Sequence, residues 1–357
     1  MTVQWELRLY DNDGARKATF DTWPELAVTT YVNKPAVFGL RLDGNDTRVS
    51  LFEDDAILEG WWCDQDNGID WRREFIGLCI DRDKWTDREG ARHFQVSGLG
   101  PEDVLARTII DVYAGTGASD QSAKGEVCLK NWVDQEVVSA TTRAARPGIT
   151  IEALHAPTLG ATWDGQRSNR NLLTVCQQIA EAAGLYFKIE RLSTGAFAFQ
   201  FQVGVATDRR TTVRFSEAMG NMGEPRVTVR RSEMVNWIKA GGTESGTLRN
   251  TAYASDAVSI ALSPWGRRER FVNAADQLGD QLTEKAEAEL DENRAQTILD
   301  YTVLQTPGCL YGKHYFLGDY VTAIYDGVSY DRRIDSVPWK VTKAGAWADV
   351  KTVEMPA

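Results

Sequence analysis

The sequence predicts a β-rich α+β fold in which two β-barrel domains bracket a mixed α+β domain. Short segments of alternating apolar and polar residues fill the first hundred positions, and a helical pattern followed by a hairpin pattern occupies the middle. Further strand patterns flank one long amphipathic helix near the end. Because 357 residues are too many for one small core, roughly two to three domains are expected. The predicted domains are 1–110, 111–223 and 224–357.

The predicted first domain, 1–110, consists mainly of short strands separated by turn signals. In the first strand, Trp5, Leu7 and Leu9 share one face, and Glu6 and Arg8 lie on the other. Further strands are expected at 38–42, 55–62, 75–81 and 92–97. Many short strands with Asp-Gly turns between them are typical of a sandwich or a barrel. A short helix is expected to follow from Pro101 to about Ile110, because proline suits the first helical position.

The predicted middle domain, 111–223, mixes a helix with a hairpin. Residues 115–125 are small and polar, which favours a linker. A helix is predicted from about Ser168 to Ala183, with Gly184 at the position after its C-cap. The strand patterns at 186–189 and 197–201 predict a hairpin packed on that helix.

The predicted last domain, 224–357, combines strands with the longest helix of the chain. Strand patterns occur at 227–229 and 235–240. The helix is expected at about 276–294, where Leu278, Leu282, Ala286 and Leu290 recur every four residues. This apolar stripe is narrow, so the helix is expected to lie on a surface. Strands are then predicted at 297–304, 319–325, 329–337 and 340–353, with a hairpin turn at 326–327.

Charge and cysteine content exclude several classes of protein. The net charge of -11 disfavours stable binding of nucleic acid, which needs clustered basic residues. The cysteines at 63, 79, 128, 176 and 309 are odd in number and widely spaced, so they imply neither a disulfide framework nor a zinc site. Cys79 and Cys176 are expected to be core residues in a protein assembled in a reducing compartment. No apolar run approaches the roughly 18 residues of a membrane span, and no secretory leader is expected after Met1.

No catalytic signature is present in the sequence. His93, His155 and His314 stand apart from second ligands at metal spacing, and are expected to be surface or packed residues. Nucleophile-elbow, zinc-protease and phosphate-loop motifs are missing. The acidic loop 64–70 lacks the glycine and glutamate positions of a calcium loop. The sequence therefore predicts no catalytic residue, no cofactor and no metal ion.

Three tryptophans surround the polar loop between positions 61 and 72. We interpret Trp61, Trp62 and Trp71 as an aromatic contact loop, although most aromatic residues of the chain are expected to fill cores. Exposure of all three on one loop would favour stacking on sugars. Burial of all three in a subunit contact would favour a role in assembly.

A series of short segments occurs in an order that resembles a known family. The segments are Trp5–Asp11, Phe38–Leu42, Asp54–Glu59, Arg73–Gly77, Gln95–Gly98, Asp103–Leu105, Asn171–Leu173, Phe215–Asn221, Asn236–Ile238 and Leu317–Val321. Their order is similar to that in the tail hub, or tail-associated, proteins of long-tailed bacteriophages (siphophages), which are related in fold to the contractile-tail baseplate hub. The resemblance covers nearly the whole chain, and only the tryptophan-rich loop at 61–72 departs from it.

This resemblance implies a structural role without enzymatic activity. Two tube-type barrel domains in each of three subunits would form a ring that continues the tail tube and carries the DNA channel to the tip. The implied partners are the distal tail protein, the tape-measure protein, and tail-tip or fibre proteins, with DNA passing only transiently. The protein would be assembled in the host cytoplasm and reside in the virion tail tip, without stable membrane association. An acidic lumen would repel phosphate and let DNA slide.

Two other functions remain open from the sequence. One is a carbohydrate-binding, receptor-recognition module of the tail tip, for which Trp61, Trp62 and Trp71 would supply stacking faces. The other is a wall-degrading enzyme, which would need two carboxylates at glycosidase distance in an exposed cleft. Proximity of some carboxylate pairs, such as Asp54-Asp55, is uninformative among 51 acidic residues.

Overall fold

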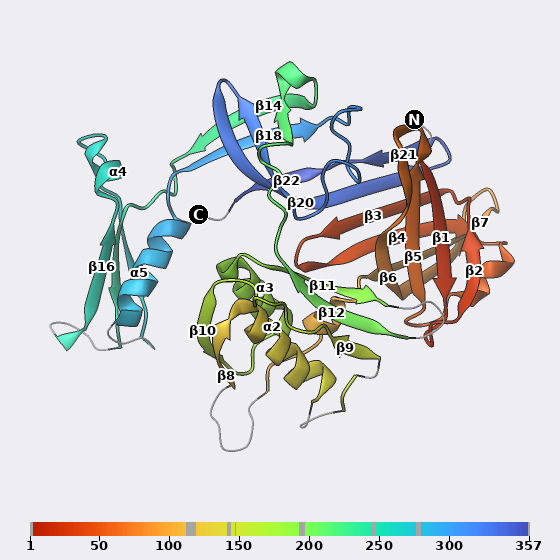
Figure 1. The fold of residues 1–357 in the computed structure, drawn as a ribbon, viewed down its shortest axis with the longest axis horizontal. Coiled ribbons are helices and arrows are strands. Elements are labelled where there is room, and N and C mark those ends of the chain that lie inside the picture. The colour runs from red at the N-terminus through yellow and green to blue at the C-terminus, as the bar shows by residue number, and fades with distance from the viewer. Residues whose placement is uncertain are drawn as a thin grey trace. The chain divides into compact units, whose positions relative to one another are not determined.

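The chain separates into two compact units. The computed structural model describes residues 3–111, 119–140, 144–146, 148–192, 197–243, 248–275 and 280–355. The larger unit comprises 1–223 with 302–357, and the smaller unit comprises 224–301 (Figure 1). The division into units follows residues 223 and 301, and residues 224–357 fall into both units.

The larger unit, where described, contains one sheet of twelve strands. The strands are β1 (Gln4–Tyr10), β2 (Arg16–Phe20), β3 (Glu25–Tyr31), β4 (Lys34–Asp43), β5 (Ile57–Asp64), β6 (Ile69–Thr86), β7 (Arg92–Leu99), β13 (Arg214–Ser216), β19 (Tyr320–Tyr325), β20 (Val328–Thr342), β21 (Gly345–Ala348) and β22 (Lys351–Glu354). Their hydrogen-bonded order is β13-β19-β20-β3-β4-β7-β6-β5-β1-β2, and β21 and β22 both pair with β20. The sequence correctly predicts strands in this region but misses β2, β3 and β13.

Strand β20 joins the two ends of the chain. Its first half pairs with β19, and Asp326 and Gly327 form the connecting turn with positive φ values, as predicted for this hairpin. Its second half pairs antiparallel with β3, from Ser336 opposite Tyr31 to Thr342 opposite Glu25. The C-terminal strands therefore extend the N-terminal sheet.

This pairing changes the predicted architecture. Among the described strands, the sheet is an open path whose ends, β13 and β2, do not pair with each other. In the part of the chain that the structure describes, no closed barrel is found at either end of the sequence. The physical reason is that β19 and β20 find their partners in β13 and β3, instead of closing a second sheet with strands from 224–301.

A mixed module lies between β7 and β13 in the sequence. It contains the helices α1 (Asp103–Ala106), α2 (Gly125–Val133), the π-helical turn η3 (Asp134–Val138) and α3 (Leu172–Ala183), the strand pair β8 (Ser119–Lys124) with β10 (Thr162–Arg167), and the strands β9 (Ile149–Ile151), β11 (Tyr186–Arg191) and β12 (Phe199–Gly204). The predicted helix and hairpin are confirmed. The Asn171 side chain accepts a hydrogen bond from the Thr174 N–H at the start of α3, and Gly184 follows its end with φ of 67°.

The prediction of a linker at 115–125 is wrong for 119–125, which is the described part of that segment. Residues 119–124 form β8 and Gly125 begins α2, whereas 115–118 lie outside the described residues. A Cβ atom at Gly125 would lie 2.4 Å from the Ala183 side chain, so its small size serves close packing rather than chain flexibility.

The core of the module is continuous with the sheet. Trp132 and Trp163 pack at its centre with ring centroids 5.2 Å apart, and Cys176 is fully buried beside them. The same apolar cluster includes Ile57 and Ile76 from β5 and β6. All five cysteines are free and buried, including Cys79, as the sequence predicts for it and for Cys176.

Two small sheets and two helices make up the described residues of the smaller unit. Its elements are β14 (Met222–Arg230), β15 (Trp237–Gly241), β16 (Thr251–Ser255), α4 (Ala257–Ala261), β17 (Glu269–Asn273), α5 (Asp280–Glu292) and β18 (Gln296–Val303). Strand β14 pairs with β18, and the other sheet has the order β16-β15-β17. Helix α5 buries Leu282, Ala286 and Leu290 against that sheet, as its narrow stripe predicts, while Leu278 lies outside the described residues.

The first prediction concerns close packing inside the sheet. A Cβ atom at buried Gly77 would lie 2.3 Å from the Phe38 ring, so Gly77→Ala should cost about 1–3 kcal/mol in the free energy of unfolding. Gly39 on β4 is half-buried, and a Cβ atom there meets no described atom within 4 Å. Urea unfolding should show a loss for Gly77→Ala and little change for the control, Gly39→Ala. Equal stability of the two variants would contradict this packing.

Candidate functional site

The three predicted contact tryptophans do not form one surface. Trp61 and Trp62 are neighbours on β5, so their side chains lie on opposite faces of the sheet, and Trp71 lies on β6. Trp62 is only 2% exposed, and its ring centroid lies 5.0 Å from that of Trp339. Trp61 is half-buried beneath the Arg8 guanidinium, whereas Trp71 is 41% exposed. The predicted single aromatic loop is therefore wrong, and the condition set for the sugar-binding alternative is not met.

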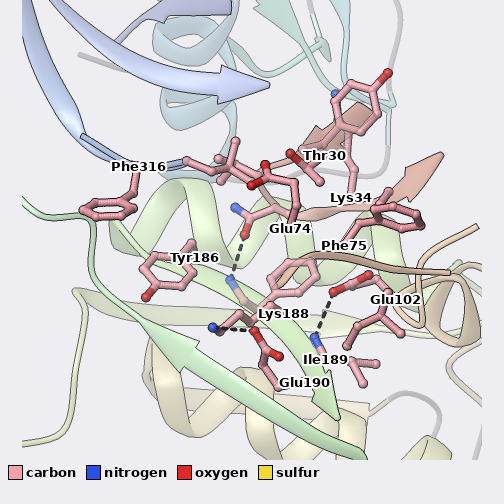
Figure 2. Close-up of a pocket in the computed structure, with 18 of the residues that line it drawn as sticks. Thr30, Lys34, Glu74, Phe75, Glu102, Tyr186, Lys188, Ile189, Glu190 and Phe316 are labelled. Atoms are coloured by element: carbon pink, nitrogen blue, oxygen red, sulfur yellow. Dashed lines mark hydrogen bonds and ion pairs between the residues drawn. The ribbon is translucent and has the colours of Figure 1, made fainter. Parts of the chain in front are cut away.

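Instead, the structure brings charged residues together in a cleft of the larger unit, where the module meets the sheet (Figure 2). The cleft has a volume of about 410 Å³. Its walls come from the β3–β4 turn, from β6, from β11 and from two segments, 205–207 and 311–319. Figure 2 shows Glu74 and Lys34 on the side of the sheet, and Tyr186, Lys188 and Glu190 on the side of β11.

A buried ion pair lies beside this cleft. The carboxylate of Glu59 on β5 and the guanidinium of Arg191 on β11 are both fully buried, 3.2 Å apart. Glu59 also accepts hydrogen bonds from Arg73 at 3.0 Å and from the Trp61 indole at 3.0 Å. The Arg191 guanidinium stacks on the Tyr10 ring, 3.9 Å from its centroid. Because a buried charge is costly unless paired, this network holds β11 against β5 and β6 in one arrangement.

The β3–β4 turn attaches the module by hydrogen bonds. Asn33 has φ of 57°, a conformation that asparagine tolerates better than most residues. Its side-chain oxygen accepts a hydrogen bond from the Phe187 N–H at 2.8 Å, and its carbonyl accepts one from Gln177 at 2.9 Å. These bonds connect the turn to β11 and α3.

Glu102, just before α1, makes a further connection to β11. Its carboxylate accepts a hydrogen bond from the Ile189 N–H at 2.9 Å (Figure 2). Burial raises the pKa of Glu102 to about 7, because the surrounding protein disfavours the charged form. The acid is therefore largely protonated below neutral pH in the folded chain.

Glu74 on β6 ties a distant segment of sequence to the sheet. Its carboxylate accepts hydrogen bonds from the Tyr311 hydroxyl at 2.8 Å and from the Trp62 indole at 2.7 Å. Burial raises the pKa of Glu74, and burial together with the Glu74 charge raises the pKa of Tyr311. Arg72 donates to the Gly312 carbonyl at 2.9 Å, so Arg72 and Glu74 of β6 both hold this segment.

Two ion-pair groups involve charged residues of the cleft. Lys188 and Arg73 both contact the Glu190 carboxylate, and Arg209 contacts Asp319 at 2.5 Å. Within the described part of the chain, no group of three or more His, Cys, Asp or Glu residues is placed to hold a metal ion. No described helix combines the length and apolar character needed to cross a membrane. Because Arg73 lies on β6 and Glu190 lies on β11, the cleft is a polar joint between the sheet and the module.

The three histidines each hydrogen-bond within the fold. His93 contacts Asp87 at 2.8 Å, and the His314 ring accepts a hydrogen bond from the Leu310 N–H at 2.9 Å. His155 contacts the buried Glu126 at 2.8 Å. Burial opposes ionisation of Glu126, but hydrogen bonds from Leu159, Lys130 and His155 together lower its pKa to about 2.

Sequence reasoning missed the residues of this joint. No motif distinguishes Glu59, Glu74, Glu102 and Arg191 from the other charged residues, and their partners are far away in the sequence. One signal was present: Glu59 stands in the predominantly apolar run 56–63, where a charged side chain needs a partner. That signal identifies a buried acid but not the residue that pairs with it.

The second prediction concerns the buried ion pair. Arg191→Met removes one of the two positive charges that compensate the buried Glu59 carboxylate. It should therefore lower the free energy of unfolding by about 3 kcal/mol. Arg16→Met removes a half-exposed arginine that is 3.7 Å from Glu6, and should change stability little. Chemical unfolding of both variants gives the comparison. A loss no larger for Arg191→Met than for Arg16→Met would contradict a structural role for the pair.

The third prediction concerns pH. Because the pKa of Glu102 rises from 4.5 to about 7 on folding, its contribution to stability is fully present below pH 4.5 and is lost as pH rises through about 7. Glu102→Gln keeps an acceptor for the Ile189 N–H and removes this ionisation. Urea unfolding at about pH 5 and pH 8 should show a smaller loss of stability with rising pH for this variant than for the natural chain. The control is Glu181→Gln, at an exposed position on α3. Identical pH dependence of all three proteins would refute the role of Glu102.

Comparison with solved structures places the fold among tail proteins. The 43 kDa tail protein of prophage MuSo2 from Shewanella oneidensis has a TM-score of 0.60 at 13% identity, with 98% of this chain and 100% of that chain covered. The tail protein from Neisseria meningitidis MC58 has a TM-score of 0.56 at 14% identity, with coverages of 99% and 96%. Prophage tail protein gp18 from Listeria monocytogenes EGD-e has a TM-score of 0.55 at 12% identity, with coverages of 99% and 95%. At these identities the likeness establishes the fold alone.

Sequence comparison identifies the family. No curated protein matches the chain. The model of one protein family, described as Siphovirus ReqiPepy6 Gp37-like protein, matches residues 6–351. This match covers nearly the whole chain, and it confirms the predicted resemblance to siphophage proteins with a tail-protein fold. The chain belongs to the Siphovirus ReqiPepy6 Gp37-like protein family.

Proposed function

We propose that this chain is a structural hub protein of the phage tail tip, which forms a ring that continues the tail tube and carries the DNA channel. Membership in a siphovirus family and the tail-protein fold support a structural role in the tail. Beyond a structural role in the tail, the proposal specifies a ring, three copies of the chain in that ring, and a position at the tail tip.

The main support for the proposal is the twelve-stranded sheet, to which strands from both ends of the chain contribute. Strand β20 pairs with β3, and Glu59 and Arg191 hold the module to the same sheet by a buried contact. A ring that guides DNA must keep its shape under load, and a part joined by many long-range contacts resists local opening better than one with independent pieces. This construction supports a load-bearing role rather than a catalytic one.

The edges of the sheet support assembly with other copies. Among the described strands, β2 and β13 end the hydrogen-bonded order. The outer backbone groups of an edge strand can pair with another chain. At β13 the Asn221 side chain already bonds the Ser216 N–H and the Arg214 carbonyl, so β2 is the edge better suited to such pairing. In the smaller unit, Val227 and Val229 on β14 are 36% and 58% exposed on one face. Such features suit contacts with further copies and with the proposed partners, namely the distal tail, tape-measure, and tail-tip or fibre proteins.

The proposed ring also implies how DNA passes, where the protein resides and that it is not an enzyme. DNA would pass transiently through the lumen, and the net charge of -11 would favour sliding over binding. The protein would be a virion component, assembled in the host cytoplasm and without enzymatic activity of its own.

The fourth prediction is the assembly state. Sedimentation or native mass measurement of the purified chain, alone and mixed with its neighbouring tail proteins, should detect three copies per particle. Formation of that particle only in the mixture also agrees with the proposal. A chain that stays monomeric under both conditions would contradict it.

A further inference from the structure

The smaller unit has one sheet face that no described helix covers. Helix α5 packs on the face of β15 and β16 that carries Ile238, Ala240 and Ala254. The opposite face carries Trp237 and Lys239 from β15, Tyr253 from β16 and Phe271 from β17. Tyr253 and Phe271 are 50% and 49% exposed. We call this side, with Arg249 and Arg267 at its margins, the aromatic–cationic face.

Each aromatic ring of this face has a cation over it. Arg267 lies 4.8 Å from the Trp237 ring centroid, Lys239 lies 5.3 Å from that of Tyr253, and Arg249 lies 5.2 Å from that of Phe271. A sugar would have to displace these cations to stack on the rings. The face therefore presents apolar rings beneath a layer of positive charge, which fits an anionic and partly apolar partner.

The positive charges follow the direction of β15. Arg267 lies beside Trp237 at one end of this row, and Arg249 lies beside Gly241 at the other. Lys239 is midway between Trp237 and Gly241 on the strand. Four residue steps along a strand place the ends of this row roughly 13 Å apart. Among the described residues of the face, Glu269 is acidic, and it is paired with Arg267 at 2.7 Å.

The outer side of α5 carries the opposite charge. The helix contains six acidic residues and one lysine, and it turns Glu284, Glu287, Asp291 and Glu292 to solvent. Because the helix rises about 1.5 Å per residue, these acids span roughly 12 Å. That length matches the cation row, and exposed Ala288 between the acids leaves room for close approach to the rings.

We propose that the aromatic–cationic face of one copy binds the acidic outer side of α5 in a second copy. The two surfaces lie on opposite sides of one sheet, so the contact is head to tail, and contacts of this kind close into rings when the rotation allows. The inference rests on the proposed ring and names the surface that joins its members. The occupant is thus another copy of this chain.

The test is a charge swap in the full-length chain. The face variant carries Lys239→Glu with Arg267→Glu, and the helix variant carries Glu284→Lys with Glu287→Lys. Each should raise the dissociation constant of self-association by roughly tenfold or more, measured by sedimentation over a concentration series. The chain with all four substitutions again has complementary surfaces and should recover association. Added salt should weaken association of the natural chain.

Controls separate folding from binding. Lys343→Glu makes the same charge reversal at an exposed turn of the larger unit and should associate like the natural chain. Circular dichroism and thermal unfolding establish that each variant is folded, and Lys239→Met provides a milder change if Lys239→Glu fails to fold.

The outcomes distinguish this contact from the ring itself. If the natural chain assembles and both swap variants assemble equally well, the contact is wrong while the ring stands. A natural chain that assembles only with neighbouring tail proteins also overturns this contact. If instead the face variant loses binding to a DNA duplex and keeps self-association, the occupant is nucleic acid and the inference fails.

Discussion

The pairing of β20 with β3 is the constraint on which the larger unit depends. It joins residues more than 300 positions apart, and it places Val337, Trp339 and Val341 in the sheet core. Trp339 then packs against Trp5 and Trp62, so aromatic residues from the beginning and end of the chain share one cluster. Such long-range pairing is slow to form but makes the two ends of the chain a single cooperative structure.

Buried charges fix how the module meets this sheet. An apolar contact of the same size would stabilise the fold as much, but it would let the module slide along the sheet. The charges of Glu59 and Arg191, in contrast, compensate each other in only a narrow range of geometries. Glu102 adds a bond to β11 whose strength depends on protonation near neutral pH. The module is therefore held in register by polar groups within a largely apolar interface. In the proposed ring, this geometric precision would be the purpose of the network.

Local patterns in the sequence predict elements well and their partners poorly. Alternation around Trp5 and the stripe of α3 predict β1 and α3 correctly, because hydrophobic period reflects which face is buried. The predicted linker fails at Gly125, where smallness serves packing against Ala183. The predicted aromatic loop fails because adjacent Trp61 and Trp62 point to opposite faces of a strand. The site depends on pairs such as Glu74 with Tyr311, and a single sequence carries no signal for a partner 237 positions away.

The smaller unit carries surfaces of opposite charge on opposite sides, and the larger unit supplies a sheet that joins both ends of the chain. These properties support the proposal that copies of the chain join around a channel. Cryo-electron microscopy of the phage tail tip tests this central claim most directly. The account predicts a closed ring of copies of this chain around a continuous channel that is coaxial with the tail tube. A map with the chain outside the axis, as a peripheral appendage, would contradict it.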